Sequence, residues 1–358
     1  MERFGFVGLP NAGKSSLYNA LAGGGALAAP YAFATTDPNV GVAKVPDTRL
    51  DRLAAMSASR NVVPTSIQFV DIGGLVEGAS KGEGMGNRFL AHIREVDAVV
   101  YVLRAFADPD VPGPADPMEH LSVVELELAL ADLETLEKQR ERKKKQAKID
   151  KTVAAEAAAM DAAYSFLSDG TPLYRSGLGA EESELLRPMF LLTNRPALAV
   201  VNIDESQVES AESVIAPVRA ELGSHAEVIA VAVQLEAEAA ELDPEDRAEL
   251  LEGYGLGEGA LPRFVNAAYQ LLGLRTFLTT GDKESRAWTF RAGWKAPRCA
   301  GVIHGDLERG FIRAEVIRWD ELLEIGSWSK ARDVGKLRVE GKDYEVQDGD
   351  VLEIRHNS

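Results

Sequence analysis

The stretch GLPNAGKS, from Gly8 to Ser15, decides the fold of this 358-residue chain. It matches the phosphate-loop pattern G-x-x-x-x-G-K-[ST]. A strand-like run, Phe4–Val7, precedes it and a helical pattern, Ser15–Leu21, follows it, in the order that a phosphate loop requires. A glycine-rich turn without a nucleotide is the alternative, and the Lys-Ser pair in this setting argues against it. The stretch therefore predicts a P-loop nucleotide-binding domain.

The residue types in this loop each have a physical reason. Gly8 and Gly13 allow the backbone to turn, so that successive N–H groups point at phosphate oxygens. The N-terminus of the following helix adds positive potential, Lys14 reaches the β- and γ-phosphates, and the Ser15 hydroxyl is a ligand for Mg²⁺. Lys14 is therefore a predicted catalytic residue. The predicted nucleotide-binding residues of the loop are Asn11, Ala12, Gly13, Lys14, Ser15 and Ser16.

A second phosphate element, Asp-Ile-Gly-Gly, follows the apolar run Ile67–Val70. Asp71 stands at the end of this predicted strand, where its carboxylate can hold Mg²⁺ through water. The Gly74 N–H can donate to a γ-phosphate and lose that bond on hydrolysis, which would make the loop a switch. Asp-x-x-Gly is common by itself, but after a phosphate loop it is a specific signal.

Two hydroxyl groups between these elements are candidates for closing over the magnesium. They belong to Thr35 and Thr36 in the segment Phe33–Asn39, and spacing does not separate them. We take Thr35 as the third metal ligand beside Ser15 and Asp71, with Thr36 as the alternative. A plain polar turn is a further interpretation of this segment.

Leu75 is informative because of what it lacks. In Ras-type switches a glutamine follows Asp-x-x-Gly and orients the attacking water. Leu75 stands at this catalytic position and cannot do so. The water must then be positioned by a monovalent cation such as K⁺, by a backbone group or by a bound partner, and slow basal turnover is expected.

The predicted base site is Asn202-Ile203-Asp204-Glu205, where guanine-specific proteins carry Asn-Lys-x-Asp. In those proteins the aspartate pairs with the N1–H and the 2-amine of guanine. Here the longer Glu205 replaces the aspartate and apolar Ile203 replaces the lysine. Adenine has an N1 acceptor and no 2-amine, so a carboxylate gains nothing there, whereas Asn202 can still reach N7 and N6. The motif predicts weakened guanine selection and admits ATP.

Short apolar runs recur along the chain before residue 275, and each ends at a turn-like or polar position. Strands buried on both faces have this pattern, and helical patterns separate several of the runs. The predicted fold class is therefore α/β, with a mostly parallel sheet and helices on both faces. The predicted strands are Phe4–Gly8, Ser66–Asp71, Ala98–Leu103, Ala197–Asn202 and Glu227–Val233, with Val40–Pro46 as an antiparallel edge candidate.

Two segments depart from this alternation. From Leu121 to about Leu186 the leucines recur at helical spacing, which predicts two long antiparallel helices inserted into the sheet domain. After Leu274 short strands alternate with glycine turns, as in a compact α+β module. Its predicted strands are Arg286–Phe290, Phe311–Val316, Lys336–Val339, Asp343–Val346 and Val351–Ile354. The predicted domains are residues 1–120 with 196–274, the helical insertion 121–195, and the C-terminal module 275–358.

The net charge of −17 is unevenly distributed. Val201–Ala260 holds 15 acidic residues and two basic ones, and Arg275–Ser358 holds 15 of each. Lys138–Lys148 holds seven basic residues and one acidic residue. Such a basic stripe can bind phosphate even when the whole protein is acidic. A solvated helix face that binds nothing is an equal alternative.

Composition excludes several classes of protein. The chain has no apolar run of about 18 residues, so no membrane span is expected. Its start lacks the regions of a signal peptide. Cys299 is the only cysteine, which excludes an internal disulfide and a four-cysteine zinc site, and we expect it to be a small buried apolar residue. A cytoplasmic protein is expected.

With these motifs the chain resembles the YchF (Obg-like) ATPases, a family of translation-factor-related P-loop proteins. The resemblance rests on Gly8–Ser16, Asp71–Leu90, Asn202–Glu205 and Val302–Phe311, the last being similar to the signature of the family's C-terminal TGS domain. It implies a P-loop domain split by an antiparallel coiled coil, followed by a ubiquitin-like TGS module. It also implies a preference for ATP with some use of GTP, and association with the ribosome. The expected cofactor is thus Mg²⁺, and the expected partners are ATP or GTP and the ribosome, as the large subunit or the whole particle, including its ribosomal RNA.

Differences from the family pattern are few. Gly73, Glu77 and Ala34 stand where Ala, Lys and Cys are usual, and the loop Asp108–Pro117 is short and lacks a histidine. A catalytic role for a histidine of this loop therefore does not carry over to this chain. We further expect a monomer without sequence-specific DNA binding.

Three classes of function remain open. The first is a nucleotide-hydrolysing switch that binds the ribosome. A P-loop kinase for a small molecule is the second, although no Arg-rich lid follows the core and Gly73–Gly86 suits a mobile switch. The third is a nucleotide sensor that does not hydrolyse, which would be consistent with Leu75.

Overall fold

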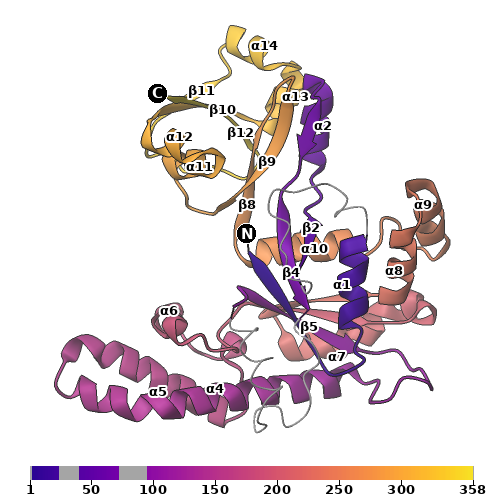
Figure 1. Cartoon of the computed structure of the whole chain (residues 1–358), viewed down its shortest axis with the longest axis vertical. Coiled ribbons are helices and arrows are strands. Elements are labelled where there is room, and N and C mark those ends of the chain that lie inside the picture. The colour runs from indigo at the N-terminus through magenta and orange to yellow at the C-terminus, as the bar shows by residue number, and fades with distance from the viewer. Residues whose placement is uncertain (1, 24–39, 72–94, 358) are drawn as a thin grey trace. The chain divides into compact units, whose positions relative to one another are not determined.

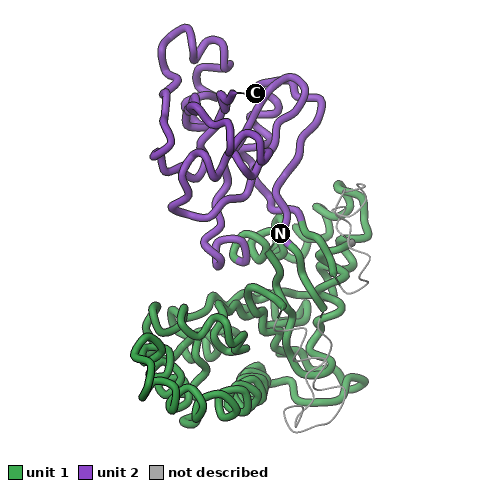
Figure 2. Tube along the Cα trace, turned by 60° about the vertical axis from the view of Figure 1, so that its left-hand side comes forward, with its two compact units in different colours: residues 1–43, 68–267 green, residues 44–67, 268–358 purple. Residues whose placement is uncertain are grey.

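The computed structural model describes residues 2–23, 40–71 and 95–357 (Figure 1). Its chain divides into two compact units, which Figure 2 distinguishes by colour. The first unit comprises residues 1–43 and 68–267, and the second comprises residues 44–67 and 268–358. Each unit has its own six-stranded sheet.

The sheet of the first unit has the strand order β2-β4-β1-β5-β6-β7. Every residue of β5 and β6 is buried, as the apolar runs predict for strands covered on both faces. The pairs β1–β4, β1–β5, β5–β6 and β6–β7 are parallel, and β2 lies at the edge. The α/β class is confirmed. The strands are β1 (Arg3–Val7), β2 (Val40–Lys44), β4 (Ser66–Asp71), β5 (Ala98–Arg104), β6 (Ala197–Asn202) and β7 (Ala226–Val231).

Helices cover both faces of this sheet (Figure 1). On one face, Leu121 and Val124 of α4 and Ile215 of α7 join the core that includes Tyr101 of β5. On the other face, Phe69 stacks on Phe6 at 5.2 Å and on Phe264 of α10 at 5.3 Å, measured between ring centroids. The helices are α1 (Lys14–Gly23), α4 (Pro117–Ala147), α5 (Ala154–Ser168), α6 (Ala180–Leu186), α7 (Ala211–Leu222), α8 (Val233–Glu241), α9 (Pro244–Gly253) and α10 (Leu261–Leu271).

The helix α4 has two differently packed halves. Its first half belongs to the sheet core, whereas Leu136 in its second half packs with Met160 and Ala163 of α5. Ion pairs of Arg140 with Asp161 and of Lys143 with Glu156 show that α4 and α5 run antiparallel. The 3-10 turn Lys151–Val153 leads into α5. Two long antiparallel helices are therefore present, and the first of them begins at Pro117 rather than at Leu121.

Asp132 fixes the return of the chain from this helix pair to the sheet. Its side chain is fully buried and accepts hydrogen bonds from the Leu192 N–H at 2.7 Å and from the N–H and hydroxyl of Thr193 at 2.8 and 2.7 Å. Three donors compensate the cost of burying a carboxylate. The segment that leads into β6 is thereby tied to α4.

The second unit has the strand order β11-β10-β12-β8-β9-β3. Residues 44–67 belong to this unit. Leu50 and Leu53 of α2 are buried together with Leu278 of β8, and β3 pairs in parallel with β9. The sequence-based limits place these residues in the P-loop domain. The elements are α2 (Thr48–Ser57), β3 (Asn61–Val63), β8 (Leu274–Thr279), β9 (Glu284–Arg291), α11 (Ala296–Ile303), α12 (Gly305–Arg309), β10 (Phe311–Arg318), α13 (Trp319–Ile325), α14 (Trp328–Asp333), β11 (Arg338–Glu340) and β12 (Asp350–His356).

One predicted strand of this unit, Asp343–Val346, is wrong. The segment forms only an isolated bridge, at Glu345, because it pairs with the chain around Trp294 and Ala296 rather than with the sheet. The strand β8, in contrast, is absent from the sequence-based prediction.

Cys299 is fully buried in the core of the second unit, and burial raises the pKa of its thiol to about 12. The thiol is therefore neutral and packs as a small apolar side chain, as predicted. Among the helices of the described ranges, none combines the length and the apolar character that crossing a membrane requires.

Candidate nucleotide-binding site

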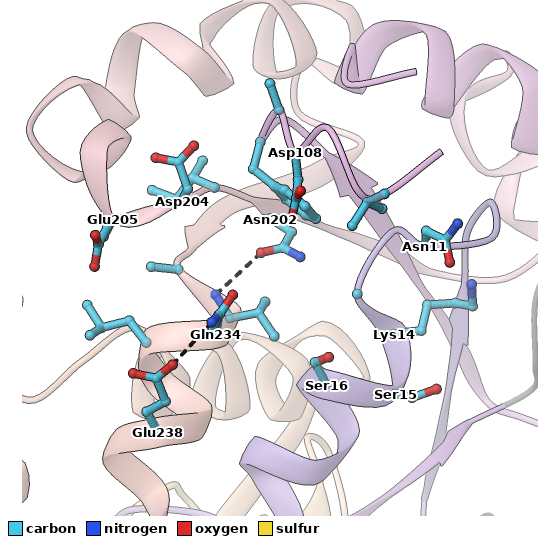
Figure 3. Close-up of a pocket in the computed structure, with 18 of the residues that line it drawn as sticks. Asn11, Lys14, Ser15, Ser16, Asp108, Asn202, Asp204, Glu205, Gln234 and Glu238 are labelled. Carbon is cyan, nitrogen blue, oxygen red and sulfur yellow. Dashed lines mark hydrogen bonds between the residues drawn. The ribbon is translucent and has the colours of Figure 1, made fainter. Parts of the chain in front are cut away.

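The phosphate loop and the base motif line one cavity of about 670 Å³ in the first unit (Figure 3). It lies at the carboxyl ends of β1, β5 and β6 and at the start of α8, the edge at which α/β proteins bind ligands. The residues that line it come from four segments, within residues 11–16, 106–111, 202–205 and 232–238. The structure thus brings together two motifs that stand almost 190 residues apart in the sequence.

Two glycines of the phosphate loop cannot be replaced without displacing a neighbour. Gly13 has a φ of +98°, and a Cβ there would lie 2.2 Å from the Asn202 Nδ2. A Cβ on Gly8 would lie 2.4 Å from the carbonyl oxygen of Val102. The loop therefore packs closely against β5 and the base motif, which explains the glycines of the pattern.

Lys14 is buried between the loop and the sheet, with only 6% of its surface exposed. Its ammonium donates to the carbonyl oxygens of Gly8 at 3.1 Å and Leu9 at 2.8 Å. An ammonium has three N–H donors, so one remains for a phosphate oxygen. Burial lowers the pKa of Lys14 to about 8, although the charge of Asp71 acts in the opposite direction.

Ser15 and Asp71 are in direct contact, since the Ser15 hydroxyl donates to Asp71 Oδ2 at 2.7 Å. Two of the three predicted metal ligands therefore lie together. Hydroxyl and carboxylate oxygens suit Mg²⁺, which usually takes one or two carboxylates and completes its shell with water and substrate phosphates. The described ranges contain no cluster of three or more His, Cys, Asp or Glu side chains that could hold a metal ion. The residues fit a Mg²⁺ that shares its ligands with a nucleotide.

The other predicted residues of the phosphate end cannot be placed. Thr35 and its alternative Thr36 lie outside the described residues, and so do Gly74 and Leu75. Their roles in metal binding and catalysis stay predictions. Asn11 and Ser16 line the cavity, and Asn11 adopts a left-handed conformation with a φ of +62°.

Asn202 joins the two ends of the cavity. Its Nδ2 donates to the Ala12 carbonyl at 3.0 Å, and its Oδ1 accepts from the Val233 N–H at 3.3 Å. The observed contacts of Asn202 thus position the phosphate loop against α8. One amide N–H and one lone pair remain, so the predicted contact with adenine N7 and N6 stays open.

The next residues of the base motif differ in exposure. Ile203 is buried in the core of the sheet and lines the cavity with part of its surface. Glu205 is exposed, and its Oε2 accepts a hydrogen bond from the Tyr254 hydroxyl at 2.9 Å. The carboxylate that replaces the guanine-binding aspartate is thus oriented by a tyrosine that the sequence pattern does not indicate.

Arg104 supports the wall of the cavity formed by residues 106–111. It is 2% exposed, and its guanidinium donates to the carbonyls of Phe106, Val111 and Pro112 at 3.0 to 3.2 Å. It also lies 4.6 Å from the ring centroid of Phe106. Sequence reasoning missed this residue, although an arginine at the end of a fully apolar run was a usable signal.

Gln234 and Glu238 of α8 are further cavity residues that the motifs do not include. They lie one helical turn apart beside the base motif (Figure 3). Nothing in the sequence distinguishes them from other polar residues of a surface helix. Only the fold reveals them.

Two parts of the chain match families of known proteins. Residues 3–154 match a family described as a 50S ribosome-binding GTPase. Residues 274–357 match the C-terminal domain of YchF GTPases, which is described as a protein of unknown function. The two matches lie on either side of the base motif.

Individual proteins are similar over the full length. The ribosome-binding ATPase YchF of Bacillus subtilis is 46% identical over 360 residues, which cover 99% of this chain and 98% of that protein. The protein of the same name from Escherichia coli O157:H7 is 43% identical over 359 residues, with the same coverage. The solved structure of the Schizosaccharomyces pombe YchF GTPase is 31% identical, has a TM-score of 0.89, and covers 99% of this chain and 97% of its own.

Proposed function

Because the chain belongs to the YchF family, we propose that it is a ribosome-associated P-loop nucleotide hydrolase that prefers ATP, uses some GTP and acts as a nucleotide-dependent switch. The observation that carries the proposal is the grouping of Lys14 and Ser15, which line one end of the cavity, with Asp71, which accepts a hydrogen bond from Ser15. A cation, a hydroxyl and a carboxylate are the groups that an Mg²⁺–nucleoside triphosphate requires.

The reaction is hydrolysis of the β–γ phosphoanhydride bond. The oxygen of a water molecule bonds to the γ-phosphorus while the bond from this phosphorus to the bridging oxygen breaks, giving ADP and phosphate and releasing a proton to solvent. Lys14 and the backbone N–H groups of the loop hold the phosphates and stabilise the charge that develops on them. Ser15 and Asp71 would hold Mg²⁺, which when bound neutralises the charge of the β- and γ-phosphates.

The remaining catalytic assignments follow from the motifs. Gly74 is proposed to donate its N–H to the γ-phosphate, and Thr35 to complete the metal shell. Leu75 cannot orient water, so a monovalent cation such as K⁺, a backbone group or a bound partner does this. Slow turnover of the isolated protein follows.

The domain roles are proposed in the same way. Residues 1–120 with 196–274 correspond to the P-loop domain, except residues 44–67, which belong to the second compact unit. Residues 121–195 correspond to the coiled-coil insertion, and residues 275–358 to a ubiquitin-like TGS module. A cytoplasmic monomer that binds ribosomal RNA, with no affinity for membranes or for specific DNA sequences, fits the family.

Phosphate release from ATP, measured with and without ribosomes, tests the proposed function. We expect slow release by the protein with Mg²⁺ alone and faster release when ribosomes are added. A P-loop kinase would need a small-molecule acceptor, and a pure sensor would release no phosphate under either condition. Absence of phosphate release in both conditions would reject the hydrolase.

The choice of base gives a second prediction. ATP should bind at least as tightly as GTP. Glu205 is longer than the aspartate that pairs with guanine in other proteins, and its carboxylate is already bonded to Tyr254, so it pairs with guanine less well than that aspartate does. The variant Glu205→Asp combined with Ile203→Lys should shift preference toward GTP. Titration calorimetry with non-hydrolysable analogues measures both affinities.

Glu205→Asp alone is the control in this experiment, because Ile203 is buried and a lysine there affects the core. Thermal unfolding of the double variant separates loss of structure from a change of specificity. A clear preference of the unmodified protein for GTP would show that the motif is misread.

A further inference from the structure

Gln234 and Glu238 form a polar pair on the wall of the cavity. Gln234 is the second residue of α8, and its Nε2 donates to Glu238 Oε1 at 3.2 Å. Both residues line the cavity on the side of the base motif (Figure 3). The Oε1 of Gln234 is on the other arm of the amide and points toward the middle of the cavity (Figure 3).

We propose that Gln234 is a specificity-determining residue for the base and that Glu238 is its positioning residue. Glu238 holds the amide so that an acceptor, and not a donor, faces the bound base. The inference rests on the proposed function, since it requires a purine nucleotide in this cavity.

The chemistry of the two side chains favours one direction of the amide. An ionised carboxylate only accepts hydrogen bonds, whereas a glutamine amide offers a donor on one arm and an acceptor on the other. Turning the amide over would place Oε1 against the carboxylate of Glu238 and would lose the hydrogen bond. Glu238 therefore favours the orientation in which Nε2 points toward it.

An acceptor at this place distinguishes the two purines. Adenine carries an amine at C6, which donates, and guanine carries a carbonyl oxygen there, which accepts. The Gln234 oxygen can accept from the adenine amine and repels the guanine oxygen. Glu205, which is bonded to Tyr254, pairs with the N1–H and the 2-amine of guanine less well than an aspartate does, so GTP use is reduced and not abolished.

Other groups of the wall do not reverse this preference. The Asn202 amide is bonded to Ala12 and Val233, and its remaining N–H and lone pair offer the base one donor and one acceptor. Asp108, Asp204, Glu205 and Glu238 add carboxylates to the cavity wall, and the Ser16 hydroxyl is a further polar group there. In the part of the wall that the structure describes, the side chains at the base end thus present mainly acceptors.

Replacing the carboxylate of Glu238, which accepts hydrogen bonds, with a group that donates them tests the proposal. In the variant Glu238→Lys an ammonium donates to Gln234 Oε1, so the amide turns over and presents Nε2 to the base. We expect the ratio of ATP to GTP affinity to shift toward GTP by about tenfold, the effect of one hydrogen bond of about 1.4 kcal/mol. Calorimetry with non-hydrolysable analogues measures the ratio.

The matched control is Glu241→Lys. Glu241 is exposed on the same helix, and its change of charge is identical, but it does not line the cavity. A lysine there attracts both triphosphates alike, so both affinities can rise while their ratio stays constant. The comparison separates amide orientation from general electrostatics.

The variant Gln234→Leu completes a double-mutant cycle. It should reduce the preference for ATP, and Glu238→Lys should shift nothing further in this background. An unchanged ratio in Glu238→Lys, or an equal shift with and without Gln234, would overturn the proposal. Failure of the proposed function has a different signature, namely that the unmodified protein binds neither nucleotide.

Discussion

Replacement of Lys14 by alanine should reduce ATP hydrolysis at least about a hundredfold, the usual cost of removing one group that stabilises transition-state charge. The ammonium is the buried cation of the cavity's phosphate end, with two N–H groups bonded to Gly8 and Leu9 and a third for a phosphate. Its depressed pKa shows that the folded protein disfavours the charge at this place. The variant should therefore fold normally. Phosphate release and thermal unfolding measure the two effects.

The same lysine makes nucleotide binding depend on pH. Its pKa of about 8 lies below the ordinary value, so the empty site loses the positive charge as the pH rises through about 8. ATP affinity should then fall by up to about tenfold per pH unit, because only the protonated form attracts phosphate. Lys14→Arg is the control, since a guanidinium remains charged throughout this range. In the first experiment, a normal rate of ATP hydrolysis by the Lys14→Ala variant would show that Lys14 is not a catalytic residue.

Much of the first unit could be predicted because its signals are local. Apolar runs bounded by turn residues mark five of the six strands, and the ends of these strands place Asp71 and Asn202 at the same edge of the sheet. The contact of Ser15 with Asp71 follows from that topology. The fixed spacing of the phosphate loop then places Lys14 next to Ser15 at the same end of the site.

The segment 44–67 could not be assigned because its partners are remote. The strand β3 has three residues, too few for a periodic pattern, and it pairs with β9 more than 200 residues later. Likewise, Asp343–Val346 has the composition of a strand, but its backbone is bonded to the chain at Trp294 and Ala296. Composition indicates whether a segment favours an extended conformation, but long-range pairing decides whether it becomes a strand of the sheet.

The residues at the base end of the site could be predicted only in part, for the same reason. Asn202 and Glu205 belong to a known motif, whereas Gln234, Glu238 and Tyr254 become relevant only because α8 and α9 fold next to it. Their hydrogen bonds decide which polar atoms face the cavity. A motif therefore locates this site, and the neighbouring helices set its selectivity.

In the structure, the seven basic residues of the stripe Lys138–Lys148 fall into two groups, those in ion pairs and those that form none with a described residue. Four of its bases are neutralised in ion pairs: Lys138 with Glu134, Lys143 with Glu156, and Arg140 and Lys144 with Asp161. The other three are exposed and make no ion pair with a described residue: Arg142, Lys145 and Lys148. They lie near the turn between α4 and α5, where Ile149 is 92% exposed. These three bases, together with the turn, are available to RNA.

Replacement of Arg142, Lys145 and Lys148 with Gln should weaken ribosome co-sedimentation at least about tenfold at low salt. Each base that contacts a phosphate releases a counterion, so the slope of log affinity against log salt should become shallower by about two units. The matched control replaces Lys138, Lys143 and Lys144 with Gln, which removes the same charge from the same helix. Because these lysines are already paired, the control should lose less affinity, and basal ATP hydrolysis should be unchanged in both variants. Equal losses in the two variants would show that only total charge matters, and no loss at any salt concentration would mean that the stripe is a solvated helix face.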